Sequence, residues 1–231
     1  MKVRVLAFHH ISSGKRELQR YPGISTSLFT FRLLLLALKL CGYKFCLFQE
    51  LPALSKKRTI VLNFDDAYHS VYTKAFPFLS SMGIKAHVCI TGASITNPNR
   101  QNQLPLMTIE EAGKMQQQGW DFINHSMNHA ILVGKDEPEL LQEIAAPVQQ
   151  FNHAGLPLNP DYFCLPEGKS DAQAETFIRS KGYKYLLTTK EDLWETTVGG
   201  AKVPRINIAS QSLWYALYKI TARHDSFWKR K

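Results

Sequence analysis

Short apolar runs alternate with helical patterns along nearly the whole chain. Apolar, often β-branched runs predict buried strands, and apolar residues repeating every three or four positions predict amphipathic helices. The predicted strands cover residues 3–8, 43–48, 58–64, 84–91, 120–124, 162–165, 185–188 and 203–208. The predicted helices cover residues 27–40, 71–81, 108–118, 138–154, 172–181 and 213–223. Strict alternation of this kind is typical of a parallel α/β sheet.

The connections carry recognisable start and stop signals. Thr108 and Glu111 form a predicted capping box, and Ser25 or Ser27 is the expected cap of the helix at 27–40. Residues 9–26 and 92–106 are predicted to be loops. A chain of 231 residues suits one domain, so these elements belong to one barrel or one open doubly wound sheet.

Polar residues follow several predicted strands at the point where each strand ends. They are His9, His10, Asp65, Asp66, His125 and Glu167. In a parallel barrel the carboxyl ends of all strands share one face, where such folds place their active sites. Closure of the barrel also makes the first and last strands neighbours, so a residue at position 9 can meet one at position 125. An open sheet remains the competing prediction.

Two of these stretches offer ligands for a metal. Asp65 and Asp66 are adjacent and point to different sides if the strand pattern continues, so one can bind a cation while the other handles a proton. His125 and His129 are four residues apart, which places both on one side of a helical turn or tight loop. One Asp and two His form a three-ligand set with an open position for water. The pattern indicates a metal-dependent hydrolase, although the aspartates taken alone also suit a helix N-cap.

The same stretches resemble a known family, the NodB-homology polysaccharide deacetylases. Asn63-Phe64-Asp65-Asp66 resembles its T-F-D-D motif, and the segment from His125 to His129 resembles its H-[ST]-x-x-H motif. The turn from Phe163 to Gly168 is similar to its F-x-Y-P-Y-G motif. The opening Phe8-His9-His10-Ile11 is similar to the start of the permuted branch that contains the poly-N-acetylglucosamine deacetylases.

The resemblance implies a distorted, TIM-like (β/α)7 barrel and a role for each matching residue. Asp65 would be the general base, and Asp66, His125 and His129 would hold a divalent metal, usually Zn²⁺. The backbone N–H of Glu167 would stabilise the oxyanion. His9 would be the general acid that protonates the leaving amine.

Three positions depart from the family pattern. Asn63 replaces a threonine, and Ala67 replaces the glycine that usually follows the two aspartates. Glu167 replaces the tyrosine of the third motif, which keeps the backbone donor but brings a negative charge to the sugar cleft. Arg205, at another strand end, is expected either to orient Asp65, to bind a substrate phosphate or to form a structural ion pair.

The formal net charge of +9 is uneven along the chain. Residues 202–231 hold seven Lys or Arg and one acid, so we divide the chain into a barrel at 1–210 and a basic amphipathic helix and tail at 211–231. Such a tail could contact an anionic membrane surface, with nucleic acid the less favoured partner. The favoured interpretation is a packed last helix with a solvated basic end.

Four cysteines show no paired spacing, and we predict that Cys41, Cys46, Cys89 and Cys164 are buried free thiols. The apolar stretch at 28–40 is too short to cross a bilayer. We therefore expect a cytoplasmic protein, with peripheral membrane contact left open.

The leading hypothesis is a metal-dependent hydrolase that removes N-acetyl groups from an N-acetylated sugar or polysaccharide intermediate. O-deacetylation uses the same chemistry and stays open. Two other classes compete with it: a non-catalytic barrel that binds glycan or metal, and a basic scaffold that docks to a membrane through its C-terminus.

Overall fold

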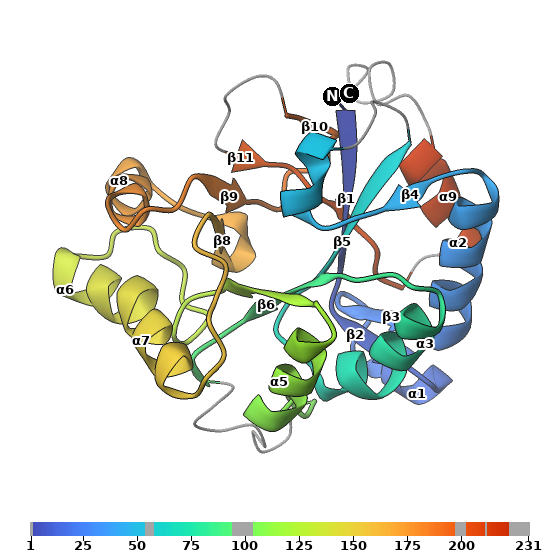
Figure 1. Ribbon diagram of the computed structural model, residues 1–231, viewed down its shortest axis with the longest axis horizontal. Helices are drawn as coiled ribbons and strands as arrows, with labels where there is room; N and C mark the ends of the chain where they lie inside the picture. The colour runs from blue at the N-terminus through green and yellow to red at the C-terminus, as the bar shows by residue number, and fades with distance from the viewer. Residues whose placement is uncertain (1, 54–57, 94–103, 197–201, 211, 222–231) are drawn as a thin grey trace.

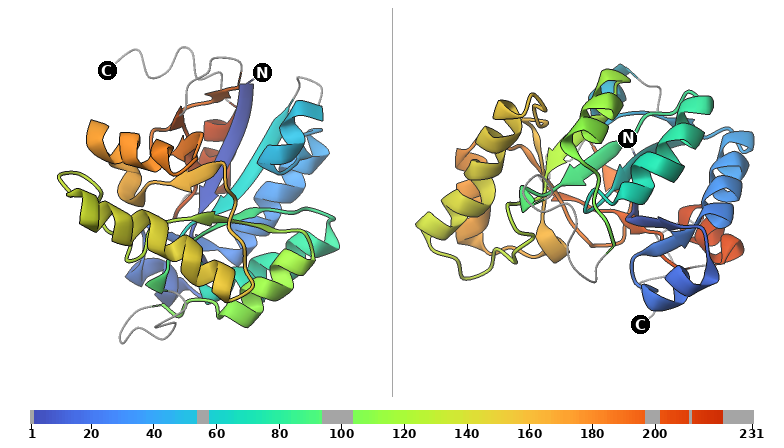
Figure 2. Two further views of the ribbon diagram at one scale, coloured as in Figure 1. Left: turned by 60° about the vertical axis from the view of Figure 1, so that its left-hand side comes forward. Right: turned by 90° about the horizontal axis from the view of Figure 1, so that it is seen from below.

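The computed structural model describes residues 2–53, 58–93, 104–196, 202–210 and 212–221. Its main sheet has ten strands, and helices surround them on the outside (Figures 1 and 2). Six strands follow one another in parallel along the chain: β1 (Lys2–Phe8), β5 (Thr59–Phe64), β6 (His87–Ile90), β7 (Asp121–Asn124), β8 (Tyr162–Cys164) and β9 (Tyr185–Leu187). The predicted alternation of strands and helices is confirmed.

The sheet returns to its first strand through a single stretch of chain. β11 (Lys202–Val203) pairs with β9, and β12 (Ile206–Asn207) pairs with β1, both in parallel. Because this stretch pairs with both ends of the sheet, the strands form a distorted, nearly closed barrel within one α/β domain. The predicted barrel is confirmed, and the open doubly wound alternative is wrong. Two short strands pair with the amino ends of central strands: β10 (Trp194–Glu195) runs antiparallel to β1, and β4 (Lys44–Phe45) runs parallel to β5.

The central strands are buried on both faces because helices cover the outside while side chains fill the inside. Every residue of β5 is buried. One apolar cluster fills the inside of the barrel with residues such as Val5, Val61, Ile123 and Leu187. A larger cluster joins the strands to the outer helices. The filled interior leaves the polar residues to the carboxyl ends of the strands.

Local signals place several helix ends as predicted. The Ser27 hydroxyl accepts the Thr30 N–H at the start of α2 (Leu28–Leu40). Thr108 and Glu111 form the predicted capping box of α5 (Ile109–Gln117). Further along, α8 (Ala172–Ser180) begins after Asp171, whose carboxylate accepts the Ala174 N–H. These caps satisfy backbone donors that would otherwise lack partners.

Two predicted helices contain wider turns beside a proline. The helix at 71–81 consists of the π-turn η2 (Val71–Ala75) and α3 (Phe76–Ser81), which contains Pro77. The helix at 138–154 consists of α6 (Glu137–Leu140), the π-turn η3 (Leu141–Ala145) and α7 (Ala146–His153), which contains Pro147. Proline lacks an N–H and crowds the preceding turn, which explains why the regular hydrogen-bond ladder changes there.

Some short elements were not predicted. The stretch expected to be a loop after the first strand contains β2 (His10–Ser12), α1 (Lys15–Arg20) and β3 (Ser25–Ser27), with β2 and β3 paired in parallel. The strand predicted at 43–48 ends early, since the 3-10 helix η1 (Phe48–Ala53) follows β4. The strand predicted at 203–208 is divided between β11 and β12 at Pro204-Arg205. Elements of two or three residues are too short for periodicity to reveal.

The four cysteines are free, and three of them are buried. Cys41 is exposed, so the prediction that all four are buried is wrong for it. It is the C-cap of α2 and lies at the surface because the helix ends there. Within the described residues, no helix is both long and apolar enough to cross a bilayer.

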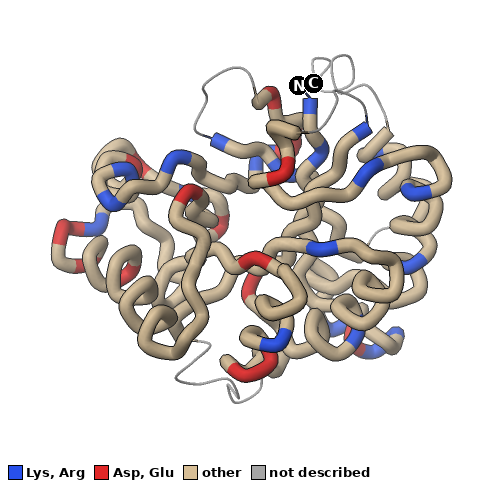
Figure 3. Tube along the Cα trace, in the orientation of Figure 1, with Lys and Arg blue, Asp and Glu red and all other residues tan. Residues whose placement is uncertain are grey.

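In its described part, the basic C-terminal stretch agrees with the expected packed last helix and gives no support to membrane contact. The helix α9 (Leu213–Thr221) packs on the core through Ala216 and Ile220 and exposes Trp214. Three of the seven basic residues are described, and each forms an ion pair with an acid: Lys202 with Glu175, Arg205 with Asp65 and Lys219 with Glu191. In the view of Figure 3, Lys and Arg occur on both sides of the molecule rather than in one patch. The other four basic residues lie outside the described part, and the domain division at 210 stays a prediction.

Candidate active site

The residues predicted at the strand ends meet in one cavity of about 440 Å³. It is lined by His9 from the end of β1, Asp65 and Asp66 from the end of β5, His125 and His129 after β7, and Glu167 after β8, together with Arg205 and Glu191. The structure therefore brings together the predicted catalytic residues and metal ligands, whereas His10, which also follows the first predicted strand, lies outside the cavity. Closure of the barrel accounts for this meeting, because β1 lies beside β5 on one side and beside β12 on the other.

Asp65 is held at the bottom of the cavity by several donors. Its side chain is nearly buried, and Oδ1 accepts hydrogen bonds from Arg205 Nη1 at 2.6 Å and Asn63 Nδ2 at 2.7 Å. Burial opposes ionisation of this carboxyl, but the charge of Arg205 outweighs that effect and holds its pKa well below the usual range. Asp65 is therefore a carboxylate at any physiological pH, with Oδ2 left toward the cavity side.

His9 lies beside that second oxygen. Its Nε2 is 3.6 Å from Asp65 Oδ2, and its side chain is 19% exposed, so it can reach a molecule in the cavity. Its Nδ1 is buried and has no hydrogen-bond partner among the described residues. The family resemblance assigned His9 the general-acid role, and the ring is placed where a bound substrate could contact it.

Asp66, His125 and His129 form a compact group of potential metal ligands. Their ligand atoms all lie within 4.8 Å of one another. Asp66 Oδ1 is 3.5 Å from Nε2 of His125 and 3.5 Å from Nε2 of His129. His125 Nδ1 donates to the Cys164 carbonyl at 2.8 Å, which directs Nε2 toward the group. A buried second partner of this kind commonly fixes the tautomer of a metal-binding histidine.

Two of these ligands, Asp66 and His129, have pKa shifts that suit a cation. Burial opposes ionisation of Asp66, but its hydrogen bond with His125 keeps its pKa below the usual range. Burial and the neighbouring His125 both lower the pKa of His129, so its imidazole stays neutral to a lower pH than a free one. Burial opposes protonation of His125, but Cys164 and Asp66 raise its pKa well above the usual value, so a cation would have to displace a proton from its Nε2. Two imidazole nitrogens and one carboxylate oxygen are a donor set that fits Zn²⁺ or a similar divalent ion.

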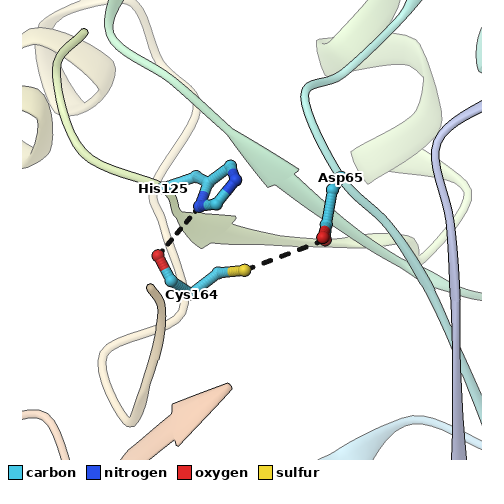
Figure 4. A group of neighbouring side chains, drawn as sticks. All are labelled: Asp65, His125 and Cys164. Atoms are coloured by element: carbon cyan, nitrogen blue, oxygen red, sulfur yellow. Dashed lines mark hydrogen bonds between the residues drawn. The ribbon is translucent and has the colours of Figure 1, made fainter. Parts of the chain in front are cut away.

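A second group of potential ligands shares His125 with the first (Figure 4). It consists of Asp65, His125 and Cys164, all buried, with Cys164 Sγ 3.8 Å from Asp65 Oδ1. That oxygen already accepts bonds from Arg205 and Asn63, and the buried guanidinium would repel a cation placed beside it. The group with Asp66 is therefore the better metal site.

The backbone around the site is unusually strained. Seven described residues other than glycine have a positive φ. Asp66, His129 and Glu167 line the cavity, and Ala67 and Ser126 each follow a lining residue in the sequence. Such a backbone costs energy for residues with a β-carbon and is commonly found where side chains are aimed at a ligand. Ala67 has φ 51°, a conformation that glycine adopts more readily than alanine.

A second cavity of about 390 Å³ adjoins the first. The two share Ile24, Asp66 and His129, and the second extends past Tyr21 and Tyr68. Ile24 and Tyr21 belong to the segment between β1 and α2 that was predicted to be a featureless loop. The two cavities together extend past the potential metal ligands Asp66 and His129, which gives room for an extended molecule.

Comparisons with known proteins agree with this geometry. A profile of the polysaccharide deacetylase family matches residues 54–186, which is more than half of the chain. The chain belongs to the polysaccharide deacetylase family. It is 25% identical over 221 residues to a poly-β-1,6-N-acetyl-D-glucosamine N-deacetylase of Staphylococcus epidermidis, covering 89% of this chain and 74% of that protein.

Solved structures show the same fold in other deacetylases. The Streptococcus pyogenes deacetylase PplD in complex with acetate superposes with a TM-score of 0.82 at 22% identity, covering 95% of this chain and 98% of that one. IcaB from Ammonifex degensii superposes with a TM-score of 0.81 at 18% identity, covering 95% and 97% of the two chains. The similarity extends beyond the profile match to nearly the whole deacetylase barrel.

Glu167, where the chain departs from the third motif of the family, has an exposed side chain at the cavity. Its Oε2 is 2.7 Å from Lys169 Nζ. The hydrogen bond with Lys169 lowers the pKa of Glu167, so the carboxylate is ionised and paired. The charge that the sequence predicted in the sugar cleft is therefore countered by a neighbour two residues away.

Three supporting residues were missed or left undecided. Arg205 had been left open among three roles, and the structure shows that it holds Asp65. The motif comparison gives Asn63 no role, yet its amide donates to Asp65. Glu143, in the π-turn η3, accepts both the backbone and the side-chain N–H of Asn128 at 3.0 and 2.9 Å and so fixes the loop that carries His129. No sequence signal identified Glu143, because it reaches the loop only through tertiary packing.

Two other histidines, His10 and His87, lie away from the cavity. His10 Nδ1 lies 3.1 Å from the Ser25 hydroxyl and packs against Tyr68. His87 is fully buried at the amino end of β6.

Proposed function

We propose that this chain is a metal-dependent N-deacetylase of a polysaccharide built from N-acetylated amino sugars. One observation carries the proposal: the ligand atoms of Asp66, His125 and His129 lie within 4.8 Å of one another, in the cavity that also contains Asp65 and His9. Metal-assisted hydrolysis of an acetamide uses this combination of a cation site, a base and an acid.

A bound divalent ion would supply Lewis acidity, polarising the acetyl carbonyl and making water a better nucleophile. Asp65 takes the proton of the attacking water at Oδ2, because Oδ1 is held by Arg205 and Asn63. His9 donates a proton from Nε2 to the amide nitrogen as the C–N bond breaks, so the products are acetate and a free amine. The proton on Asp65 can return to His9 across the 3.6 Å between Oδ2 and Nε2.

The backbone N–H of Glu167 is the proposed donor to the oxyanion. Glu167 follows β8 in a 3-10 turn with φ 51° and ψ 13°, and it lines the catalytic cavity. A backbone donor does not depend on the side chain, so the replacement of the family tyrosine leaves this role intact.

The substrate class follows from two lines of support. The Staphylococcus epidermidis relative is named for poly-β-1,6-N-acetyl-D-glucosamine. The adjoining cavity offers room for a sugar unit beyond the one that reacts. We therefore propose a polymer of N-acetylglucosamine rather than a single sugar.

The first test is metal content measured by mass spectrometry on the wild type, Asp66→Ala and His129→Ala. We expect about one Zn²⁺ or similar ion per wild-type chain and its loss from both variants. Release of acetate and free amine from poly-β-1,6-N-acetylglucosamine is then measured on the loaded protein, with Asp65→Asn as the variant that keeps the metal but lacks the base. A well-folded wild type that takes up no metal would instead favour a non-catalytic glycan-binding barrel.

A further inference from the structure

One acid of the catalytic cavity has no role in the proposed reaction. Glu191 lies after β9 and lines the same cavity as His9, Asp66 and His129. Its side chain is 29% exposed, and Oε1 accepts a hydrogen bond from Lys219 Nζ at 2.5 Å. A carboxylate has about four lone-pair sites, so this bond leaves acceptor capacity for a molecule in the cavity.

The partner of Glu191 comes from the C-terminal helix, behind the cavity wall. Lys219 is only 8% exposed, and its Nζ also donates to the Asn207 carbonyl at 2.9 Å. Asn207 belongs to β12 and lines the same cavity. Lysine is rarely buried to this degree without a charged partner, because an ammonium loses much hydration there. The lysine therefore binds both segments of this wall.

The ion pair sets the charge that the wall presents. With Lys219 attached, Glu191 keeps its acceptor oxygens but contributes little net negative charge to the cavity. Such a group suits a neutral donor, such as a sugar hydroxyl or an acetamide N–H. It gives less advantage to the ammonium group of a deacetylated sugar than an unpaired carboxylate would.

We propose that Glu191 is a sugar-binding residue of this cavity, that Lys219 of α9 holds it in place, and that the pair favours the neutral N-acetylated sugar over its cationic product. The inference rests on the proposed function for the identity of the sugar. It also makes α9 a supporting part of the catalytic wall, although the helix lies beyond the residues matched by the family profile.

The test compares Glu191→Ala, Lys219→Met and the double variant. The probes are a β-1,6-linked N-acetylglucosamine pentamer, its deacetylated form as inhibitor, and 4-nitrophenyl acetate, which contains no sugar. Glu191→Ala is expected to raise KM for the pentamer about fivefold with kcat within about twofold, since one hydrogen bond is worth about 1 kcal/mol. Hydrolysis of the sugar-free ester should not change.

Lys219→Met separates positioning from general destabilisation. It frees the charge of Glu191, so we expect KM for the pentamer to rise while the inhibition constant of the deacetylated pentamer falls. Lys219→Arg should restore both constants toward the wild type, and the double variant should match Glu191→Ala alone. The matched controls are Lys135→Met and Glu139→Gln, which break an exposed 3.0 Å ion pair at the start of α6.

Binding of the pentamer, measured by calorimetry on the metal-loaded proteins, distinguishes the possible failures. Hydrolysis of the pentamer with unchanged KM in Glu191→Ala would overturn the inference and keep the proposed function. Binding without hydrolysis, weakened in Glu191→Ala, would overturn the proposed function and keep the inference. Neither binding nor hydrolysis by the wild type would overturn both.

Discussion

Each end of the barrel contains a close contact between a histidine and an aspartate, and the surroundings of the two contacts differ. At the amino end, His87 Nδ1 is 3.0 Å from Asp121 Oδ2, and its Nε2 accepts the Phe48 N–H at 3.0 Å. The Phe48 ring lies 4.4 Å from the imidazole. At the carboxyl end, His9 Nε2 is 3.6 Å from Asp65 Oδ2, and the imidazole lines a cavity. The backbone near this cavity has positive φ angles.

This comparison shows that residue type does not separate a structural histidine from a functional one. Both nitrogens of His87 face protein groups, and the ring is fully buried, so it has no atom available to a ligand. By contrast, His9 and His129 line the cavity, so their imidazoles are accessible to a ligand. Four predictions test the contrast between the two ends, from the largest expected effect to the smallest.

The largest effect is expected for Arg205→Met at the carboxyl end. This change leaves Asp65 buried without its charged partner, so the free energy of unfolding should fall by about 3–5 kcal/mol at pH 7, and deacetylation should be lost. Denaturant unfolding and an acetate-release assay measure the two effects. Arg32→Met, which removes an exposed arginine that stacks on Phe78, is the control and should change stability by less than about 0.5 kcal/mol.

The loss of stability in Arg205→Met should depend on pH. Because the folded protein holds the pKa of Asp65 below its ordinary value, this carboxyl stabilises the wild type above about pH 4, and that stabilisation is lost as pH falls further. The difference in stability between wild type and Arg205→Met should therefore shrink on acidification below pH 4. A difference that stays constant would show that Arg205 acts through packing rather than charge.

The second prediction compares one histidine variant from each end of the barrel. His129→Ala should lower metal affinity and deacetylation at least about a hundredfold with little change in the stability of the metal-free protein. His87→Leu should leave metal content and activity per folded molecule unchanged but reduce stability by about 1–3 kcal/mol, since the Phe48 N–H loses its acceptor. Metal analysis and thermal unfolding measure metal binding and stability in both variants. If each variant lost both metal binding and stability, the contrast between the two ends of the barrel would be refuted.

The third prediction concerns support of the metal loop. Glu143→Ala removes the acceptor of both Asn128 N–H groups, so the loop carrying His129 should lose its fixed position. We expect metal affinity to fall about tenfold to a hundredfold, as for other residues that hold a metal ligand from behind. Competition with a zinc chelator measures it. Glu139→Gln on neighbouring α6 serves as the control, and an equal loss in both variants would count against the assigned role.

The smallest effect is expected for Asp121→Asn. The change keeps the shape of the side chain but weakens the contact with His87 Nδ1 and the 2.6 Å hydrogen bond from Asn159 Nδ2. Stability should fall by about 1 kcal/mol, and metal content and activity should stay as in the wild type. A loss of activity without a loss of stability would show that the amino end influences catalysis.

Prediction from sequence succeeded where one local pattern carries the information. Apolar runs marked the strands, Thr108 and Glu111 marked a helix start, and the polar residues after the strands marked the active-site face. It failed for elements of two or three residues such as β2 and β3, which contain too few positions for a periodicity. It also failed for the π-turns η2 and η3, whose width depends on how the whole helix packs beside a proline.

The candidate site divides in the same way. Asp65, Asp66, His125, His129, His9 and Glu167 could be named from their motifs and from their places at strand ends. The function of Arg205 could not be decided, because it follows from closure of the barrel, which brings position 205 to position 65. Glu191 and Lys219 gave no signal at all, since they are separated by 28 residues and meet only across a folded wall.

The sequence by itself determined the kinds of elements, their order and the chemistry available at the strand ends, because these depend on neighbouring residues. Only the tertiary structure decided which carboxylate is held by a guanidinium, which histidines keep an accessible nitrogen and which lysine neutralises the cavity wall. Those properties depend on burial and on charges a few ångströms away, and both arise from contacts between distant parts of the chain.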